Sequence, residues 1–451
     1  MERQLCGSEI EMEAVIETTK SPTATPEAPY YVRALALGLM AFLIGVHFWT
    51  WVFMLPTFLG GRADFRQLYT AGYMVRTGHA QELYSYDSQL RFQNELVSPA
   101  AVPLPFIRPA YQALLFVPFT WLRYRTAYFA FLAVNLILLG ISFCFLRPHM
   151  ERLAEVYRWL PFAMFLGYLP IAAALLQGQD SILLLTLLLA ASASIRGRRE
   201  LLAGVLVGLG LFKFQIVLPI ALLFLLWRRW RFLAGFAISA TTVGSISLCL
   251  VGLAQARVYA LSLVTMGAGL APKADLLRYP VPVVAMANFH GLIVGLAGGR
   301  ISVFWIQALT LAVSGVVFGL VAARVSLDRG GRDALLLAIT ASTLVSYYLL
   351  IHDLTVLLIP IAVTLNHFIG AEATRHRTGR LIARASALMF VSPICFSYIP
   401  DHFFVVALPV LAFLVALLAA QPARGAADTS MFALAGLDYP PSKPLPLAGS
   451  F

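Results

Sequence analysis

Residues 34–66 of this chain read ALALGLMAFLIGVHFWTWVFMLPTFLGGRADFR, and this stretch decides the fold class. Its apolar part, Ala34–Leu59, is longer than the roughly 20 residues that a helix needs to cross the hydrocarbon core of a membrane. A polar stretch begins at Gly60 and lasts until Pro109. The sequence therefore predicts a membrane-spanning helix followed by a long loop at the membrane surface.

The composition extends this prediction to the whole chain. Of the 451 residues, 60% are hydrophobic and 12% are charged, whereas a soluble domain is about half apolar and a quarter charged. A membrane β-barrel would instead show alternating segments of about 10 residues. We expect an all-α polytopic membrane protein with about 10–13 transmembrane helices. The expected spans are Ala34–Phe58, Tyr128–Leu146, Leu160–Leu176, Ser181–Ile195, Phe232–Leu253, Ser302–Ala323, Ala334–Leu349, Leu354–Ile369, Ile382–Phe396 and Phe403–Ala420.

The distribution of charge predicts the topology. The net charge is +11, but most arginines lie in short loops between spans, which indicates the positive-inside rule and not a nucleic-acid partner. All the basic loops share the cytoplasmic side only if Ala110–Leu122 does not cross and Leu201–Trp227 is a hairpin that turns near Lys213. In the alternative topology both segments cross once, and two basic loops lie outside. The basic loops are Arg147–Arg158, Arg196–Arg199, Arg228–Arg231, Arg324–Arg332 and Arg375–Arg384.

We divide the chain into one membrane domain and two tails. Residues 1–32 and 421–451 have the composition of disordered tails, the first of them cytoplasmic. Residues 33–420 form a single transmembrane domain, in which residues 60–109 and 254–300 are long extracytoplasmic loops. In the first of these loops the aromatic spacing predicts interfacial helices from Phe65 and over Tyr86–Val97, with their aromatic side chains toward the lipid. The four cysteines form no CxxC pair, so neither a disulfide framework nor a zinc site is indicated.

Asp64 is the first candidate for chemistry. A carboxylate at a membrane surface can act as a general base on an acceptor hydroxyl. The neighbouring Arg62 and Arg66 would keep it ionised and attract a phosphate. The alternative is that Asp64 only caps the helix that begins at Phe65.

Three further groups of polar residues stand out. His352 and Asp353 interrupt an apolar region, where an ionisable group costs about 2.5–3.5 kcal/mol, so they indicate either a site or a turn exposed to headgroups. Lys213 either binds a phosphate as a point charge or extends to a nearby interface. Gln179 and Asp180 form a polar turn that either binds sugar hydroxyls or is an ordinary turn with a helix cap. No Walker loop, HExxH, GxSxG or dinucleotide-binding motif occurs in the sequence.

Taken together, these stretches resemble glycosyltransferase family 87, the polyprenol-phosphate-mannose-dependent mannosyltransferases of the GT-C superfamily. The likeness is best from Gly60 to Arg231. One departure is Arg108-Pro109-Ala110, where the family tends to show Tyr-Pro-Pro. The matching residues are Asp64-Phe65, Tyr69, Ala71-Gly72, Gly78, Leu83-Tyr84, Pro105-Phe106, Pro109, Ala113-Leu114-Leu115-Phe116, Pro118, Gly178-Gln179, Gly204, Gly208 and Lys213.

The resemblance implies a GT-C-like bundle in the plasma (inner) membrane with its active site on the extracytoplasmic face. It implies inverting transfer of a sugar, mannose by this likeness, from a polyprenyl-phosphate donor to a hydroxyl of a glycolipid or cell-envelope glycan. Asp64 then corresponds to the essential acidic residue of the family and acts as the general base, and His352 is a second catalytic candidate. The donor phosphate would meet Lys213, Arg62, Arg66 and Arg108, and the sugar or acceptor would meet Tyr69, Gln179, Asp180 and His290. No cofactor is indicated, because no carboxylate pair near Asp64 in the sequence supports a divalent metal.

Two other classes remain as alternatives: a secondary transporter or lipid flippase, and a non-catalytic membrane protein of envelope assembly. Transporters place their sites near the midplane in paired broken helices. In this chain the polar residues concentrate at one expected face, and only Lys213 favours a transporter. The Asp64→Asn substitution separates these classes, because only a transferase should lose turnover.

Overall fold

The computed structural model describes residues 30–100, 102–267, 283–325, 332–369 and 377–420. These residues form helices and turns without any strand, which confirms the predicted all-α class. The expected tails lie outside the described residues, except that residues 30–32 belong to the first helix. The helices are α1 Tyr30–Thr57, α2 Phe65–Arg76, α3 Tyr86–Leu96, α4 Tyr111–Phe116, α5 Tyr124–Leu146, α6 Glu151–Val156, α7 Leu160–Gly167, α8 Leu169–Gln177, α9 Ser181–Arg196, α10 Glu200–Leu209, α11 Phe214–Leu226, α12 Trp230–Gly267, α13 Phe289–Ala297, α14 Val303–Arg324, α15 Arg332–Val345, α16 Leu358–Phe368, α17 Arg377–Val391, α18 Cys395–Tyr398 and α19 Ala407–Ala420.

The number of full-length spans is lower than expected. Within the described residues, 8 helical segments are long and apolar enough to cross a membrane, or up to 9 if a bent helix pair counts as one span. One of the 8, Glu200–Leu226, consists of two helices whose outer ends meet, so it is not a single crossing. The apolar helices α9 and α15 are shorter. A helix of 16 residues, such as α9, is only about 24 Å long, less than the roughly 30 Å of the hydrocarbon core. At the N-terminal end of α9, Asp180 and Ser181 are each 1% exposed, so this short helix begins at polar groups inside the protein.

The expected span Leu160–Leu176 is broken in two. Helices α7 and α8 meet at an angle of 56°. The physical reason is Pro170, which has no N–H to donate to the carbonyl of Leu166. The ring of His47 in α1 takes that place, with Nδ1 2.8 Å from the Leu166 oxygen. The hydrogen bond between His47 and the free carbonyl of Leu166 therefore also holds α1 against the bundle.

The segment after α9 is a hairpin, as predicted. Helix α10 leads into a 3₁₀ turn, η5 Gly210–Lys213, and α11 runs back. Glu200 at the start of α10 and Arg229 just after α11 form an ion pair, with Oε1 and Nη1 2.8 Å apart. The two ends of the segment therefore meet, so the chain reverses at Lys213. Helix α4 is only 6 residues long, too short to cross the hydrocarbon core, which agrees with the prediction for Ala110–Leu122.

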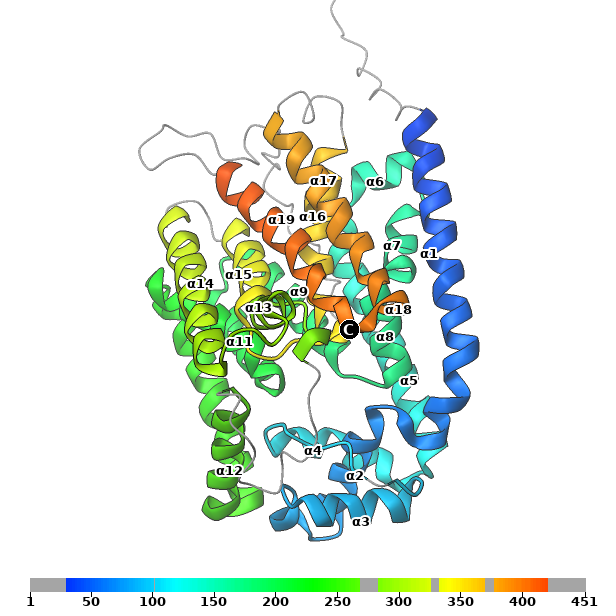
Figure 1. Cartoon of the computed structure of the whole chain (residues 1–451), viewed down its shortest axis with the longest axis vertical. Helices are drawn as coiled ribbons and strands as arrows, with labels where there is room; N and C mark the ends of the chain where they lie inside the picture. The colour runs from blue at the N-terminus through cyan, green and yellow to red at the C-terminus, as the bar shows by residue number, and fades with distance from the viewer. Residues whose placement is uncertain (1–29, 101, 268–282, 326–331, 370–376, 421–451) are drawn as a thin grey trace, which may run out of the picture.

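Helix α12 is longer than the expected span. It continues past Leu253 to Gly267, so the start of the expected loop 254–300 is helical. Gly252 interrupts it with φ +74°, a conformation that favours glycine. Beyond this kink, Tyr259 stacks on Tyr84 at a ring distance of 4.9 Å. The second part of α12 thus extends alongside the short helices at one end of the bundle (Figure 1).

Helices α2, α3 and α4 form a layer across that end of the molecule (Figure 1). The two helices predicted in the first loop are confirmed as α2 and α3, but the expectation that their aromatics face lipid is wrong for α2. Phe65 is fully buried and packs edge-on against Phe116 and Tyr128 and stacked on Phe131. Aromatic contacts of this kind add to the stabilisation from burial. They fix the first residues of α2 between the layer and the bundle.

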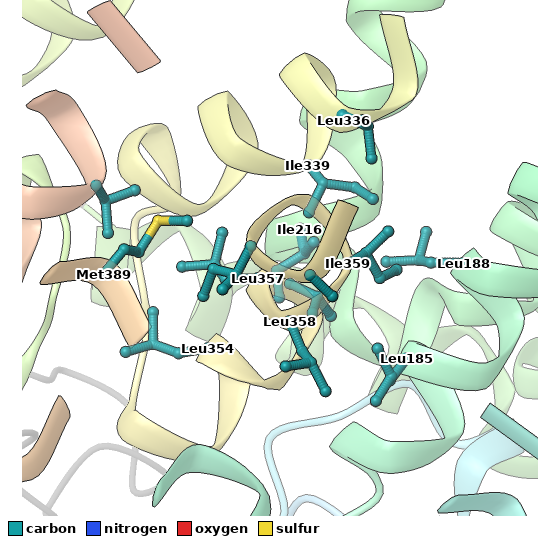
Figure 2. Packing of buried hydrophobic residues seen from close by; sticks show 14 of the residues in the cluster. Leu185, Leu188, Ile216, Leu336, Ile339, Leu354, Leu357, Leu358, Ile359 and Met389 are labelled. Atoms are coloured by element: carbon teal, nitrogen blue, oxygen red, sulfur yellow. The ribbon is translucent and has the colours of Figure 1, made fainter. Parts of the chain in front are cut away.

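The centre of the bundle is built around α16 and the 3₁₀ segment before it, η8 Ile351–Leu357. Of the span Ile351–Phe368, 83% is buried inside the protein. Figure 2 shows its apolar side chains among those of α9, α11, α15 and α17. His352 and Asp353 lie in η8 with exposures of 2% and 1%, so they are not a turn exposed to headgroups. The labelled core residues are Leu185, Leu188, Ile216, Leu336, Ile339, Leu354, Leu357, Leu358, Ile359 and Met389.

Candidate active site

Asp64 lies where the chain turns from α1 into α2. The π-helical turn η1, Phe58–Arg62, contains Gly61 at φ +99°, which allows the chain to change direction. Asp64 occupies the N-cap position of α2, but its side chain makes no capping hydrogen bond. Its Oδ2 instead accepts a hydrogen bond from Gln179 Nε2 at 2.5 Å. The capping alternative therefore does not describe this carboxylate.

Gln179 is brought to Asp64 by the turn between α8 and α9. Gly178 ends α8 with φ +61°. A Cβ on Gly178 would lie 2.7 Å from the Cβ of Phe65, so only glycine permits this approach. The close contact places Gln179 beside the residue that precedes Phe65, and the predicted polar turn and the predicted acid meet.

Arg108 joins this turn from the loop before α4. Its Nη2 donates to Gln179 Oε1 at 2.7 Å, and its Nη1 lies 2.9 Å from both carboxylate oxygens of Asp180. The side chain of Gln112 in α4 also donates to Asp180 Oδ2. Burial lowers the pKa of Arg108, but the carboxylates of Asp180 and Asp353 outweigh burial and hold the pKa above its ordinary value. Arg108 is therefore a permanent cation of the site.

Lys213 supplies the second cation from the tip of the α10–α11 hairpin. Its Nζ lies 2.6 Å from Asp353 Oδ1, 3.6 Å from Asp180 Oδ1 and 3.4 Å from Gln179 Oε1. With an exposure of 2%, it does not extend to an interface. The hairpin thus delivers a buried ammonium group to the residues around Asp64.

His352 stands at the edge of this cluster. Its Nδ1 is 2.9 Å from Gln177 Oε1, and its Nε2 is 3.5 Å from Asp353 Oδ1. Asp353 also accepts a hydrogen bond from the backbone N–H of Leu350 at 3.1 Å. His352 and Leu350 therefore orient the carboxylate that holds Lys213.

The cluster as a whole contains more negatively than positively charged side chains. Asp64, Asp180 and Asp353 face two cations, so its formal charge is −1 when His352 is neutral. Both cations are already paired, as buried charges must be. An anion that enters this site therefore has to share Arg108 or Lys213 with a carboxylate.

Two of the predicted phosphate-binding arginines lie outside the cluster. Arg66 points away from Asp64, and its guanidinium donates to Gly61, Gln93, Asn94 and Ser98. Arg62 is exposed beside Asp64. Of the four predicted cations, the structure thus joins only Arg108 and Lys213 to Asp64 through direct contacts with Gln179.

Tyr69 and His290 are also separate from the cluster. The Tyr69 hydroxyl donates to the Leu122 carbonyl at 2.8 Å, which ties α2 to the residues before α5. His290 lies near the start of α13 and hydrogen-bonds the backbone of Tyr347, and burial lowers its pKa. Gln179 and Asp180 are therefore the only two of the four predicted sugar or acceptor residues that contact the cluster within the described part of the chain.

The sequence analysis did not predict the contacts of Gln112 and Gln177, and it singled out Asp353 without its partner. The cost of a charge in an apolar run marked Asp353 as a candidate, but it did not identify Lys213 as the cation that pairs with it. Gln112 had no such signal, since a glutamine in a short helix is ordinary. The expectation of no carboxylate near Asp64 was also incomplete, because folding brings Asp180 and Asp353 into the same cluster. Among the described residues, no group of three or more His, Cys, Asp or Glu side chains could hold a metal ion.

Comparison with known proteins gives one match. Residues 106–352, more than half of the chain, match the model of glycosyltransferase family 87. No curated protein and no solved structure matches the chain. The matched segment includes Arg108, Gln179, Asp180, Lys213 and His352 and begins after Asp64, which lies outside it. It confirms the resemblance seen in the sequence, and it favours a glycosyltransferase over a transporter.

Proposed function

Because this chain belongs to glycosyltransferase family 87, we propose that it moves a sugar from a polyprenyl-phosphate carrier to a hydroxyl of a lipid-linked or cell-envelope glycan. Asp64 acts as the general base, and the anomeric centre inverts. Mannose is the sugar that the sequence resemblance suggests. The acceptor oxygen forms a bond to the anomeric carbon while the bond to the phosphate oxygen breaks, and the hydroxyl proton goes to Asp64.

One observation carries the choice of Asp64 as the base. Asp180 and Asp353 are each 1% exposed and bound by cations, whereas Asp64 is partly exposed. Gln179 donates to its Oδ2, and no other hydrogen bond to this carboxylate occurs within the described ranges. A general base needs a free lone pair within reach of the acceptor hydroxyl. Of the three carboxylates in the cluster, Asp64 best meets this condition.

The leaving group needs positive charge and little acid catalysis, because a phosphate is already a stable anion. Arg108 and Lys213 are the cations nearest to this chemistry, because both contact Gln179, which in turn contacts Asp64. Fixed cations in a dry site stabilise charge that develops in the transition state. His352 acts within this proposal by orienting Asp353, since it is buried against that side chain.

We place the site on the extracytoplasmic side of the plasma membrane. The α2–α4 layer lies at the opposite end of the molecule from α6 and the start of α17 (Figure 1), which belong to the basic loops. Basic loops favour the cytoplasm. An Arg62→Cys substitution in a chain without its native cysteines tests this placement. A membrane-impermeant thiol reagent should label it from outside, and labelling only from the cytoplasmic side would reverse the orientation.

The experiment that tests the function uses the full chain in liposomes. It is incubated with labelled polyprenyl-phosphate mannose, or with the glucose or galactose equivalent, and with lipids extracted from the host. The expected result is a new labelled glycolipid or glycan from one of these donors. If none of them is consumed by the folded protein, the proposed donor class is wrong.

A further inference from the structure

We infer that Gln179 is a positioning residue for the base: its amide holds the Asp64 carboxylate in one orientation and favours its ionised form. This inference rests on the proposed role of Asp64. It replaces the sugar or acceptor contact that the sequence suggested for Gln179.

The orientation of the amide is set by two cations. Gln179 Oε1 receives Arg108 Nη2 at 2.7 Å and Lys213 Nζ at 3.4 Å. Arginine and lysine can only donate, so the oxygen must face them and the NH₂ group must face Asp64. The reversed amide would place a donor against two donors and an oxygen against a carboxylate.

The backbone of Gln179 is held as firmly as its side chain. Its N–H donates to the Ala174 carbonyl at 2.8 Å, and its carbonyl accepts from Asn135 Nδ2 at 3.1 Å. Gly178 packs directly on Phe65. With an exposure of 1%, Gln179 has no surface left for a sugar. Its available chemistry is directed at Asp64.

The donated hydrogen bond favours the charged form of Asp64. Burial is the largest influence and raises the pKa of Asp64 above its ordinary value, and Asp353 also raises it. The hydrogen bond from Gln179 and the charges of Arg108 and Lys213 lower it. Tyr124 and Tyr348 are close enough to interact with Asp64 electrostatically. Removal of the N–H donor leaves the other groups in place. The carboxylate should then take up a proton at a pH about one to two units higher, the range expected for a hydrogen bond to a charged group.

The test is the pH dependence of kcat/KM in liposomes with labelled polyprenyl-phosphate mannose. In Gln179→Leu the acid limb of the profile should move up by about one to two pH units. In Gln179→Glu, which keeps the size of the side chain, it should move at least as far because a second anion faces Asp64. Gln177→Leu is the matched control: it removes an amide from the same turn that contacts His352 and not Asp64, and its limb should stay in place.

A second readout does not need turnover. Infrared difference spectra against Asp64→Asn identify the carboxyl band of Asp64, and its titration midpoint should move in the Gln179 variants as the acid limb does. An unmoved midpoint, or a raised donor or acceptor KM with an unmoved limb, would overturn the positioning role. A moved midpoint in a chain that transfers no sugar would support the positioning role and reject the proposed function instead.

Discussion

Asp64 and Arg66 are two residues apart, and their side chains do opposite things. Arg66 is buried in the α2–α3 layer, where it makes five hydrogen bonds to neutral oxygens of Gly61, Gln93, Asn94 and Ser98. Asp64 leaves the layer, contacts Gln179 in the bundle, and keeps one carboxylate oxygen without a partner among the described residues. Arg66 ties a loop together, whereas Asp64 joins a network of charges.

The comparison shows that the partners of a charge, and not its position in the sequence, decide its role. Every donor of Arg66 is used inside one layer, so its contribution is to stability. Asp64 has an oxygen that can still accept a hydrogen bond, and Gln179 connects it to the two buried cations Arg108 and Lys213. We therefore expect substitutions in the two networks to affect different quantities.

The largest effect should follow Asp64→Asn. We expect kcat to fall by about 10²–10⁴-fold, the usual contribution of a general base, with the free energy of unfolding nearly unchanged because the amide still accepts from Gln179. Asp87→Asn is the control, since Asp87 is an exposed carboxylate of α3 in the same layer. Steady-state transfer rates and thermal unfolding measure both quantities. Equal losses of kcat in Asp64→Asn and Asp87→Asn would show that Asp64 has no special role in the reaction.

Lys213→Met should cause the largest loss of stability. It leaves Asp353 buried without its 2.6 Å partner, and breaking a buried ion pair costs about 3–5 kcal/mol. The double variant Lys213→Met, Asp353→Leu removes both charges and should recover much of that loss. Unfolding curves of the purified variants in detergent measure the difference. A single variant as stable as the wild type would contradict the ion pair.

Arg66→Met should lower the free energy of unfolding by about 2–3 kcal/mol, because it leaves several buried acceptors without a donor. Its kcat per folded molecule should stay near the wild-type value. Arg62→Met, at an exposed arginine of the preceding turn, should change stability by less than about 0.5 kcal/mol. If Arg66→Met kept full stability and lost turnover, Arg66 would belong to the chemistry after all.

Gly178→Ala should affect both networks by a smaller amount, because Gly178 packs on the residue between Asp64 and Arg66. Its φ of +61° and the 2.7 Å approach to Phe65 predict a loss of about 1–3 kcal/mol together with a lower kcat. Gly140→Ala is the control, and we expect it to raise the free energy of unfolding where Gly178→Ala lowers it. Gly140 lies within α5 with open space around it, so alanine there should stabilise the helix by about 0.5–1 kcal/mol.

Much of the fold was readable from the sequence, because apolar length and loop charge are local properties. They predicted α1, α5 and α14 closely, and they predicted the hairpin at Lys213 from the basic loops alone. The break at Tyr168 had a visible cause in Pro170 that the apolar run concealed. The continuation of α12 past Leu253 was missed, because residues 254–300 were expected to form a loop, although Gln255 and Arg257 are good helix formers.

Some members of the candidate site were predictable from the sequence, but the contacts between them were not. Asp64 was a candidate as a carboxylate at the membrane surface, Lys213 as a cation within an apolar segment, and Gln179 as part of a polar turn. That Lys213 pairs with Asp353, or that Arg66 points away from Asp64, depends on packing between segments far apart in the chain. The sequence around Asp64 and Arg66 does not show which residues from distant segments will contact these two side chains.

The most direct test of the central claim separates binding from chemistry in a single turnover. Folded Asp64→Asn protein in liposomes is loaded with labelled polyprenyl-phosphate sugar, and acceptor lipid is then added. We predict that the variant retains the donor as the wild type does and forms product about 10²–10⁴-fold more slowly. Product formation at the wild-type rate by the loaded Asp64→Asn protein would show that the carboxylate does not act as the base.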